Sequence, residues 1–234
     1  MIVSNKRLIQ PAAQAAFSSD PEPNMSKAQF STKERILDAA ETLFAQHGFG
    51  GTSLRQVTSQ ADVNIAAVNY HFGSKENLVN EVFRRRMDEM SAQRLSRLQE
   101  AVTAKGGGDL DAILAAFVEP PLAMAQDRHG GGAFIRVIAR AYAEKNDGLR
   151  RFLSEQYGHV LREFAKAISA CMPGLSKEEL YWRLDFLAGA LTYAMADFGI
   201  IKRRHGVTET EHRQRAAQEL IRFAAAGFKA GKIN

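Results

Sequence analysis

One short segment of the chain concentrates side chains that are suited to binding nucleic acid. Ser53 and Arg55 lie at the expected start of a short helix, where hydroxyl and guanidinium groups commonly contact phosphates. The amide of Asn69 can pair with an adenine edge, and the small side chains of Ala66 and Ala67 suit contact with thymine methyl groups. These residue types therefore predict a surface that contacts both the backbone and the bases of DNA.

The elements that must position these residues are two short helices joined by a tight turn. The sequence SLRQ at residues 53–56 fits a capping box, which predicts a helix that ends near Ala61. Residues 62–64 form a tight turn, and Asn64 can cap a second helix over residues 65–72. This order predicts a helix-turn-helix, in which the second helix enters the major groove while the first braces it.

Two further helices are expected to frame this unit. A capping box at residues 31–34 predicts a first helix, which Gly48 ends. Ser74 can cap a fourth helix that runs to about residue 104. Residues 1–30 contain several prolines and no sustained helical period, so they are predicted to form a disordered tail.

The segment from Gly48 to Leu78 resembles the DNA-binding signature of the TetR family of transcriptional regulators. The most specific part is the ending Tyr-His-Phe-Gly-Ser-Lys-Glu-x-Leu at residues 70–78, and the resemblance extends over residues 32–79. It implies phosphate contacts at the starts of the second and fourth helices and base contacts from the third helix. The residues that the resemblance assigns to DNA binding are Thr52, Ser53, Arg55, Asn64, Ile65, Ala66, Ala67, Asn69, Tyr70, His71 and Lys75.

Two positions depart from the family pattern. Asp62 stands where the turn usually has glycine, and aspartate tolerates a left-handed backbone better than most residues. Asn69 stands where the family usually has tyrosine, which leaves the contact at that position open. The third helix also lacks Arg and Lys, so we expect modest direct readout of bases.

The remainder of the chain, residues 79–234, is expected to form a larger helical domain behind the DNA-binding domain of residues 31–78. No segment alternates with period two for long enough to predict a strand, so the expected fold class is all-α with about nine helices. Pro120 and Pro121 are expected to kink or stop the helix that begins at residue 109. Later helices are expected over residues 133–143, from 147 to about 172, from 176 to about 203, and from 208 to about 229.

The resemblance also implies a small-molecule pocket in the larger domain. Residues 150–184 are similar to the C-terminal domain of TetR-type regulators of fatty-acid metabolism, which implies a long-chain acyl ligand in an apolar pocket. For each pocket residue taken alone, packing in the core remains the alternative. The candidate ligand-binding residues are Met124, Phe134, Ile138, Tyr157, Phe186 and Tyr193.

A homodimer is the third implication, with the last two long helices packing against their copies in the partner. The helix that starts near Ser176 is apolar on most sides, with Trp182, Phe186 and Phe198 among its large residues. Such a helix must be buried on most sides. The alternative is that these residues only fill the core of a single chain.

Composition limits the other classes of protein to which the chain could belong. The net charge of +5 favours a polyanionic partner, and the single cysteine, Cys171, permits no internal disulfide and fits a reducing cytoplasm. No apolar run approaches the roughly 20 residues of a membrane helix. The histidines are scattered and no catalytic set converges, so we expect no metal site, no cofactor and no enzyme.

Together these observations predict a TetR-type repressor. It is expected to bind double-stranded operator DNA at a palindromic site as a homodimer, and to be released by a small apolar ligand. Two alternatives stay open, namely a DNA-binding regulator without a ligand and a helical protein that only binds small molecules. A filled core would favour the first alternative, and a convergent set of titratable residues would favour an enzyme or carrier.

Overall fold

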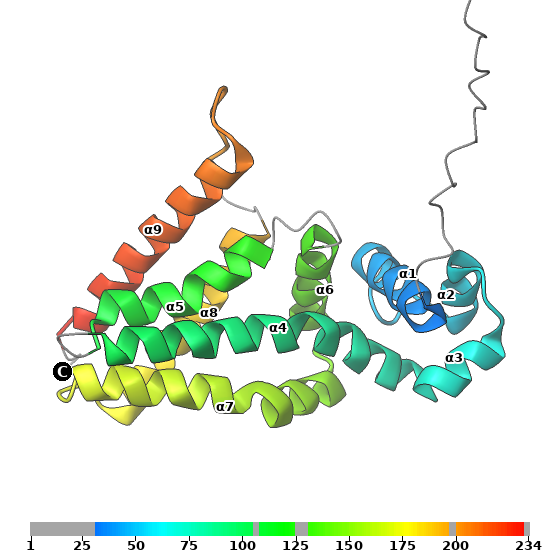
Figure 1. Cartoon of the computed structure of the whole chain (residues 1–234), viewed down its shortest axis with the longest axis horizontal. Helices are drawn as coiled ribbons and strands as arrows, with labels where there is room; N and C mark the ends of the chain where they lie inside the picture. The colour runs from blue at the N-terminus through cyan, green and yellow to red at the C-terminus, as the bar shows by residue number, and fades with distance from the viewer. Residues whose placement is uncertain (1–30, 105–107, 125–130, 197–199, 232–234) are drawn as a thin grey trace, which may run out of the picture. The chain divides into compact units, whose positions relative to one another are not determined.

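The computed structural model describes residues 31–104, 108–124, 131–196 and 200–231 (Figure 1). Over these residues the fold is all-α, as predicted, and no strand is present. The predicted tail of residues 1–30 lies outside the described residues. The nine helices of the described part are α1 Thr32–His47, α2 Leu54–Ala61, α3 Ile65–Phe72, α4 Lys75–Thr103, α5 Leu110–Met124, α6 Gly131–Ala143, α7 Asp147–Cys171, α8 Lys177–Met195 and α9 Glu209–Lys229.

The first three helices and the start of α4 share one apolar core. Each of them contributes at least one side chain with no exposed surface, which fixes the inner face of the helix. These fully buried residues are Ile36, Phe44, Val57, Val68 and Leu78. Because α2 and α3 are joined by residues 62–64 alone, their packing on α1 produces the predicted helix-turn-helix.

The helix starts follow the predicted caps closely. In a complete capping box the cap side chain accepts a bond from the backbone N–H three residues on, and that residue's side chain accepts from the cap's own N–H. Complete boxes begin at Ser53, Ser176 and Thr208. Ser31 accepts from the Glu34 N–H at 3.2 Å, but the Glu34 carboxylate lies 3.3 Å from Arg85 of α4, so this box is half formed.

Of the two outcomes predicted at the prolines, a kink or a stop, the stop does not occur, because α5 continues through Pro120 and Pro121. Pro121 has no N–H, so the carbonyl of Phe117 loses its usual partner within the helix. Arg94 of α4 replaces that partner, because its Nε–H donates to the Phe117 oxygen at 2.9 Å. The Arg94 guanidinium also lies 4.0 Å from the centre of the Phe117 ring. A side chain from a neighbouring helix thus lets α5 remain helical to Met124.

The second difference concerns the length of α8. The sequence predicted a helix from residue 176 to about 203, whereas α8 ends at Met195. Ile200 and Ile201 are 90% and 72% exposed, so the apolar run that suggested a longer helix is not buried against the core. By contrast, α6 begins at Gly131, close to its predicted start.

The larger domain has its own core, formed by α4, α5, α7, α8 and α9. At its centre the rings of Phe117 and Phe164 meet edge to face, with 5.1 Å between their centres. Leu184 of α8 and Phe228 of α9 are buried against the same cluster. Within the described residues, no helix combines the length and the apolar character that crossing a bilayer requires.

Candidate nucleic-acid interface and ligand pocket

α3 is amphipathic, with one face buried against the core and the opposite face exposed. Val68 and Phe72 are buried in the core, whereas Ile65 and Tyr70 are 45% and 85% exposed. Such large exposed apolar side chains are unusual on a surface that has no partner. The exposed face of α3 also carries Ala66, Asn69 and His71, so five of the six predicted DNA-contacting residues of this helix point away from the core, and the sixth, Ala67, is half-buried against it.

The turn before α3 has the left-handed backbone that the sequence predicted for Asp62. Its φ is 54° and its ψ is 55°, a region that aspartate enters more readily than most residues. The Arg35 side chain of α1 donates to the carbonyl of Ala61 and so holds the end of α2. Asn64 then caps α3 by accepting from the Ala67 N–H at 2.9 Å. The Asn64 oxygen predicted to face DNA is thus engaged in positioning α3.

Thr52 does not lie where a phosphate contact requires it. Its side chain is only 1% exposed, and its hydroxyl donates to the carbonyl oxygens of Gly48 at 2.8 Å and Leu43 at 3.2 Å. These carbonyls belong to the end of α1, where backbone acceptors lack helical partners. The prediction that the Thr52 side chain contacts DNA is corrected, because this hydroxyl satisfies the end of α1.

The other predicted phosphate contacts lie at helix starts. Ser53 caps α2 and is exposed, and Arg55 is exposed on the first turn of the same helix. Lys75 is half-buried at the first position of α4, directly after its cap Ser74. The partial positive charge of both helix starts favours phosphate at these positions.

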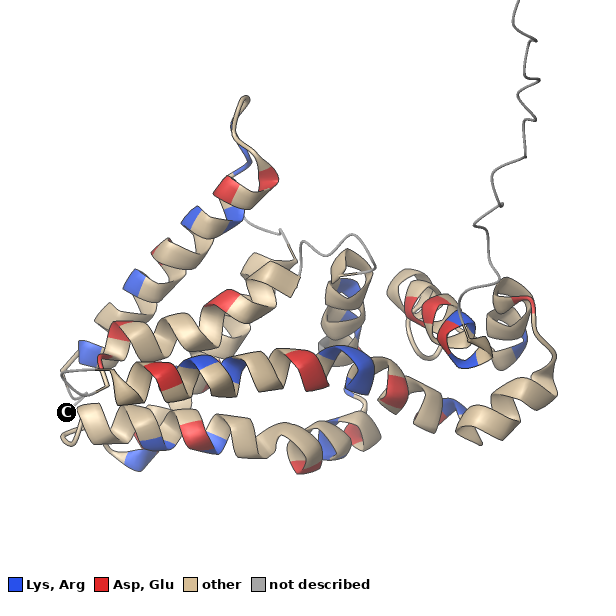
Figure 2. Cartoon of the chain, viewed as in Figure 1, with Lys and Arg blue, Asp and Glu red and all other residues tan. Residues whose placement is uncertain are grey.

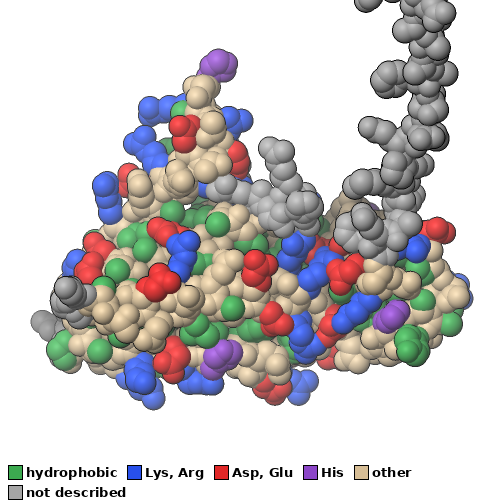
Figure 3. All heavy atoms as spheres, viewed as in Figure 1, with side chains coloured by type: hydrophobic (Ala, Val, Ile, Leu, Met, Phe, Trp, Pro, Cys, Tyr) green, Lys and Arg blue, Asp and Glu red, His purple; other side chains and the backbone are tan. Residues whose placement is uncertain are grey.

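α3, the helix predicted to contact the bases, lacks charged side chains. No Lys, Arg, Asp or Glu lies on α3, which is tan throughout in Figure 2. Acidic and basic side chains alternate over the visible face in Figure 3, without a broad basic patch. Binding of DNA by this surface must therefore depend on a few placed contacts and on two copies acting together.

α1 is fixed to α4 by a buried ion network. The Glu41 carboxylate is 2% exposed, and its oxygens lie 2.6 Å from Arg85 and 3.1 Å from Arg86. Asp38 adds a second contact to Arg85 at 2.6 Å. Burial alone would lower the pKa of Arg85, but the bonds to Glu41 and Asp38 outweigh burial and raise it. Arg85 therefore stays charged, and these contacts hold α1 and α4 together.

A second link joins the end of α6 to the loop between α1 and α2. The carboxylate of Glu144 accepts hydrogen bonds from the backbone N–H groups of Phe49, at 3.0 and 3.1 Å, and Gly50, at 3.1 Å. A Cβ at Gly48 would lie 2.1 Å from a Glu144 oxygen, and the φ of Gly48 is +75°, so this position requires glycine. Arg140 adds a bond to the Gln46 carbonyl at 3.2 Å. We call the contact of Glu144 with residues 49 and 50 the α6 clasp.

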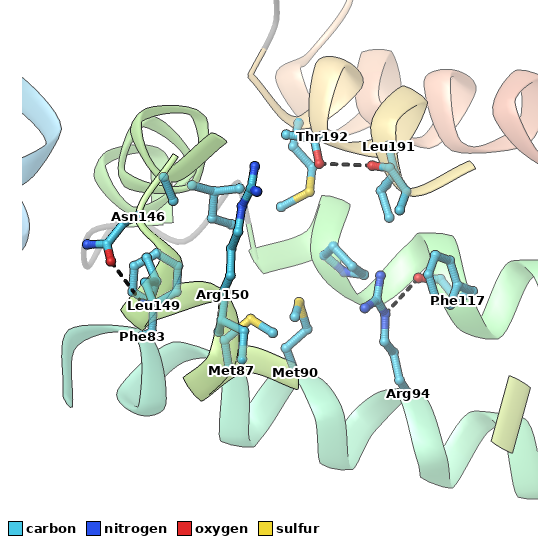
Figure 4. A pocket seen from close by; sticks show the side chains of 16 residues that line it. Phe83, Met87, Met90, Arg94, Phe117, Asn146, Leu149, Arg150, Leu191 and Thr192 are labelled. Carbon is cyan, nitrogen blue, oxygen red and sulfur yellow. Dashed lines mark hydrogen bonds between the residues drawn. The ribbon is translucent and has the colours of Figure 1, made fainter. Parts of the chain in front are cut away.

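An apolar pocket of about 320 Å³ lies in the larger domain (Figure 4). Helices α4, α5, α6, α7 and α8 all contribute to its wall. Its size is at the small end of the roughly 300–1,000 Å³ range of small-molecule sites. The lining residues are Phe83, Met87, Met90, Arg94, Phe117, Pro121, Ile138, Ala141, Asn146, Leu149, Arg150, Leu153, Ala188, Leu191, Thr192 and Met195.

One of the six predicted ligand-binding residues, Ile138, lines this pocket. Phe134 is fully buried against Phe83, with 5.3 Å between the ring centres, so it forms the layer behind the wall. Met124 lies at the end of α5, where it lines a separate smaller hollow with Arg86 and Gln93.

Tyr157, Phe186 and Tyr193 also lie outside the pocket wall. The Tyr157 hydroxyl donates to Asp88 of α4 at 2.7 Å. Burial, and next the bond to Asp88, raise the pKa of Tyr157 above its usual range, so this phenol stays neutral. Phe186 and Tyr193 are 66% and 51% exposed on the outer face of α8. Their helix lines the pocket with other residues, and Phe186 and Tyr193 lie on its opposite side.

The wall residues that the sequence reasoning missed come mainly from α4. Phe83, Met87 and Met90 form an apolar stripe on that helix, but nothing in the sequence alone says which helices cover it. Their spacing of three and four residues was the available signal. The structure pairs this face with α5 and α7, which turns an expected core stripe into one side of a pocket.

The outer faces of α8 and α9 carry exposed aromatic residues. Trp182 and Phe186 are 56% and 66% exposed, and their rings stack with 5.7 Å between centres. Phe223 on α9 is 73% exposed. Large apolar groups gathered in this way mark surfaces that bind another macromolecule.

Two family models match separate parts of the chain. Residues 36–82 match the family model described as bacterial regulatory proteins, tetR family. Residues 115–227 match the model described as tetracyclin repressor-like, C-terminal domain. Together the two matches cover more than half of the chain.

Curated relatives are similar mainly over the N-terminal helices. The probable HTH-type transcriptional regulator YttP of Bacillus subtilis is 46% identical over 57 residues, which cover 23% of this chain and 28% of YttP. The HTH-type transcriptional regulator AcrR of Shigella flexneri is 34% identical over 83 residues, or 36% of each chain. The chain thus spans about a third of the length of these relatives.

The larger domain is matched at the level of the fold. The crystal structure of a putative tetR family transcription regulator from Shewanella sp. PV-4 superposes with a TM-score of 0.59 and 21% identity. The match covers 85% of this chain and 96% of that one. The arrangement of helices is therefore shared even where the sequences have diverged.

Proposed function

Since the chain belongs to the TetR family of bacterial regulatory proteins, we propose that it is a transcriptional repressor that binds a palindromic operator as a homodimer. The observation that carries this proposal is the exposed face of α3, where Tyr70 is 85% exposed. A small apolar ligand in the pocket would release the operator. The names of the relatives are those of transcriptional regulators, which supports regulation over catalysis.

The contacts with DNA follow from what each helix exposes. Ile65, Ala66 and Asn69 face outward at the start and middle of α3, where they would meet base edges in the major groove. Ser53 and Lys75 lie at the starts of α2 and α4, where they would bind phosphates on either side of the groove. Two copies would place two such helices about one DNA turn, roughly 34 Å, apart.

The pocket offers a physical route for ligand control. Ile138 and Ala141 of α6 line it, and Glu144 follows directly after that helix. A ligand that prefers a different position of α6 would move or break the α6 clasp, and α1 and α2 would follow. Release would then be a shift between two populations, with a size set by the difference in ligand affinity. The 320 Å³ cavity also argues against a regulator without a ligand.

The test of DNA binding is a selection from random duplexes, followed by titration of the selected site at two salt concentrations. We expect an approximately palindromic site, and Tyr70→Ala to weaken binding by about 10- to 100-fold, because each base-edge contact contributes roughly 1–3 kcal/mol. Lys75→Ala should weaken all sequences alike and reduce the salt slope by about one charge.

Lys166→Ala, which changes an exposed lysine of α7 outside the proposed interface, is the matched control. It should leave both affinity and salt slope unchanged. If no sequence is enriched, and both interface variants bind DNA as the wild type does, the helix-turn-helix is only a structural unit and the proposal fails.

A further inference from the structure

The pocket is apolar along most of its wall, and two arginines, Arg94 and Arg150, add positive charge to it. We propose that it binds a compound with a single apolar chain ending in a free carboxylate, and that Arg150 binds the carboxylate. This inference rests on the proposed function, because it names the class of the releasing ligand. It goes beyond that function in assigning the charged group and the residue that recognises it.

Four polar residues line the pocket, and three of them have partners inside the protein. Arg94 donates to the Phe117 carbonyl at 2.9 Å. Asn146 caps α7 by accepting from the Leu149 N–H at 2.9 Å, and Thr192 donates to the Ala188 carbonyl at 2.9 Å. These groups serve the helices that carry them.

Arg150 is the exception among the four. It lies on the first turn of α7, and Figure 4 shows its side chain extending across the pocket. Its guanidinium has no hydrogen-bond or ion-pair partner within the described part of the chain. A guanidinium presents N–H donors in a plane that matches both oxygens of a carboxylate, and such charge-assisted pairs are strong and directional.

The charges of the residues that line the pocket also favour an anionic ligand. Among the described residues that line the pocket, two are arginines and none is acidic. A cationic ligand would be repelled by two positive side chains, and a neutral one would form no ion pair with Arg150, whose exposed side chain would keep water as its partner. A ligand with a carboxylate at the end of an apolar chain would pair with the guanidinium and pack its chain against the surrounding Met, Leu and Phe side chains.

The volume of the pocket bears on whether the ligand is the free acid or its coenzyme A thioester. At about 320 Å³ the cavity suits one unbranched chain with its carboxylate, but lies at the bottom of the range for small-molecule sites. The nucleotide part of a coenzyme A thioester would have to stay outside this cavity, and conversion to the thioester removes the carboxylate that Arg150 would bind. We therefore assign the free acid as the ligand.

Isothermal titration calorimetry on the full chain tests this assignment directly. The probes are decanoate, decanol, decylamine and decanoyl-coenzyme A. We expect decanoate to bind about tenfold tighter than decanol, because a hydrogen-bonded charge pair contributes roughly 1.5 kcal/mol. Decylamine should bind most weakly of the three chain compounds.

Variants at two adjacent arginines provide the matched comparison. Arg150→Gln keeps a hydrogen-bonding group but is shorter and loses the charge, so decanoate should bind about tenfold more weakly while decanol is unaffected. Arg151, an exposed neighbour that does not line the pocket, is the control, and Arg151→Gln should bind decanoate as the wild type does. The proposal is overturned if decanol or decanoyl-coenzyme A binds as tightly as decanoate, or if Arg150→Gln has no effect.

The outcome is separable from that of DNA binding. A protein that binds its selected operator but no decanoate refutes the carboxylate ligand and leaves the regulator intact. A protein that binds decanoate through Arg150 but enriches no DNA sequence supports the ligand assignment and refutes the proposed regulator.

Discussion

Thr52 shows that a polar residue within a DNA-binding motif can serve the fold alone. The family pattern places it among phosphate contacts, yet its hydroxyl is buried and donates to two carbonyls at the end of α1. Ser53, the next residue, is exposed and caps α2. Adjacent hydroxyls of similar chemistry thus have different environments, which sequence position alone does not distinguish.

Replacing Thr52 with valine should show whether this residue stabilises the fold or contacts DNA. Thr52→Val keeps the shape but leaves the Gly48 and Leu43 carbonyls without this donor, so we expect the free energy of unfolding to fall by about 1 kcal/mol. Chemical denaturation measures this loss. At a temperature where both proteins are folded, operator affinity should equal that of the wild type, and a loss of affinity without a loss of stability would restore Thr52 as a DNA contact.

At the scale of helices, α6 links the pocket to the first helices. Its residues Ile138 and Ala141 line the pocket, and the α6 clasp lies one turn further on. The other attachment of the first helices, the Glu41 network to α4, is buried and charged on both sides. Of the two links, the clasp is the more exposed and so the more easily broken by a ligand.

Removing the clasp should uncouple the pocket from DNA. Glu144→Ala deletes the acceptor of the Phe49 and Gly50 N–H groups, so we expect the ligand-induced loss of operator affinity to shrink several-fold, from an ordinary coupling of about 5- to 150-fold. Fluorescence anisotropy of labelled operator, with and without ligand, measures the ratio. Ligand affinity in the absence of DNA should change little.

Glu155→Ala is the matched control, since Glu155 is an exposed glutamate on α7 outside both the pocket and the clasp. Its coupling ratio should match the wild type. A Glu144→Ala protein with an unchanged ratio would mean that ligand control passes through α4 instead.

The sequence predicted most helix starts because a capping side chain binds backbone groups that are close to it in the sequence. Ser53, Asn64, Ser176 and Thr208 each begin the helix assigned to them, and Asp62 adopts the left-handed turn expected of it. These outcomes depend on side chains within a few residues of the backbone groups that they bind. Local reasoning therefore sufficed for the helix-turn-helix.

The differences arise where a distant residue intervenes. α5 passes Pro121 because Arg94, on another helix, supplies a donor for the freed carbonyl of Phe117. The pocket wall likewise depends on which helices cover α4, so only Ile138 among the predicted ligand residues lies in it. A pattern within one segment carries no information on such contacts between segments.

At the scale of the whole molecule, the exposed aromatic residues on α8 and α9 bear on assembly. Trp182, Phe186 and Phe223 remain more than half exposed in a single chain, which favours the predicted dimer through these helices over an entirely intramolecular core. A buried aromatic at the centre of an interface often carries several kcal/mol of its binding energy.

A single charge on this face should therefore break the dimer. For Trp182→Glu we expect a monomer by size-exclusion chromatography with light scattering, where the wild type gives a dimer, and a large loss of operator affinity, because two helices no longer bind together. The thermal unfolding of each chain should remain cooperative.

Tyr70→Glu is the control for that experiment, because it also places a charge at an exposed aromatic residue but on α3. Its mass in solution should equal that of the wild type. A Trp182→Glu protein that is still dimeric would move the interface away from this part of α8.

The two donors of the α6 clasp are main-chain groups, and this has a consequence for how such proteins can diversify and be engineered. Glu144 binds the N–H groups of residues 49 and 50 regardless of which side chains stand there, provided that neither is proline and that Gly48 is kept. The clasp therefore places no demand on the side chains of α2 and α3, whereas α1 must keep its Glu41 bonds to Arg85 and Arg86 and its packing. A chimera that keeps α1, Gly48 and Glu144 and takes α2 and α3 from another family member should answer to the ligand of one parent at the operator of the other.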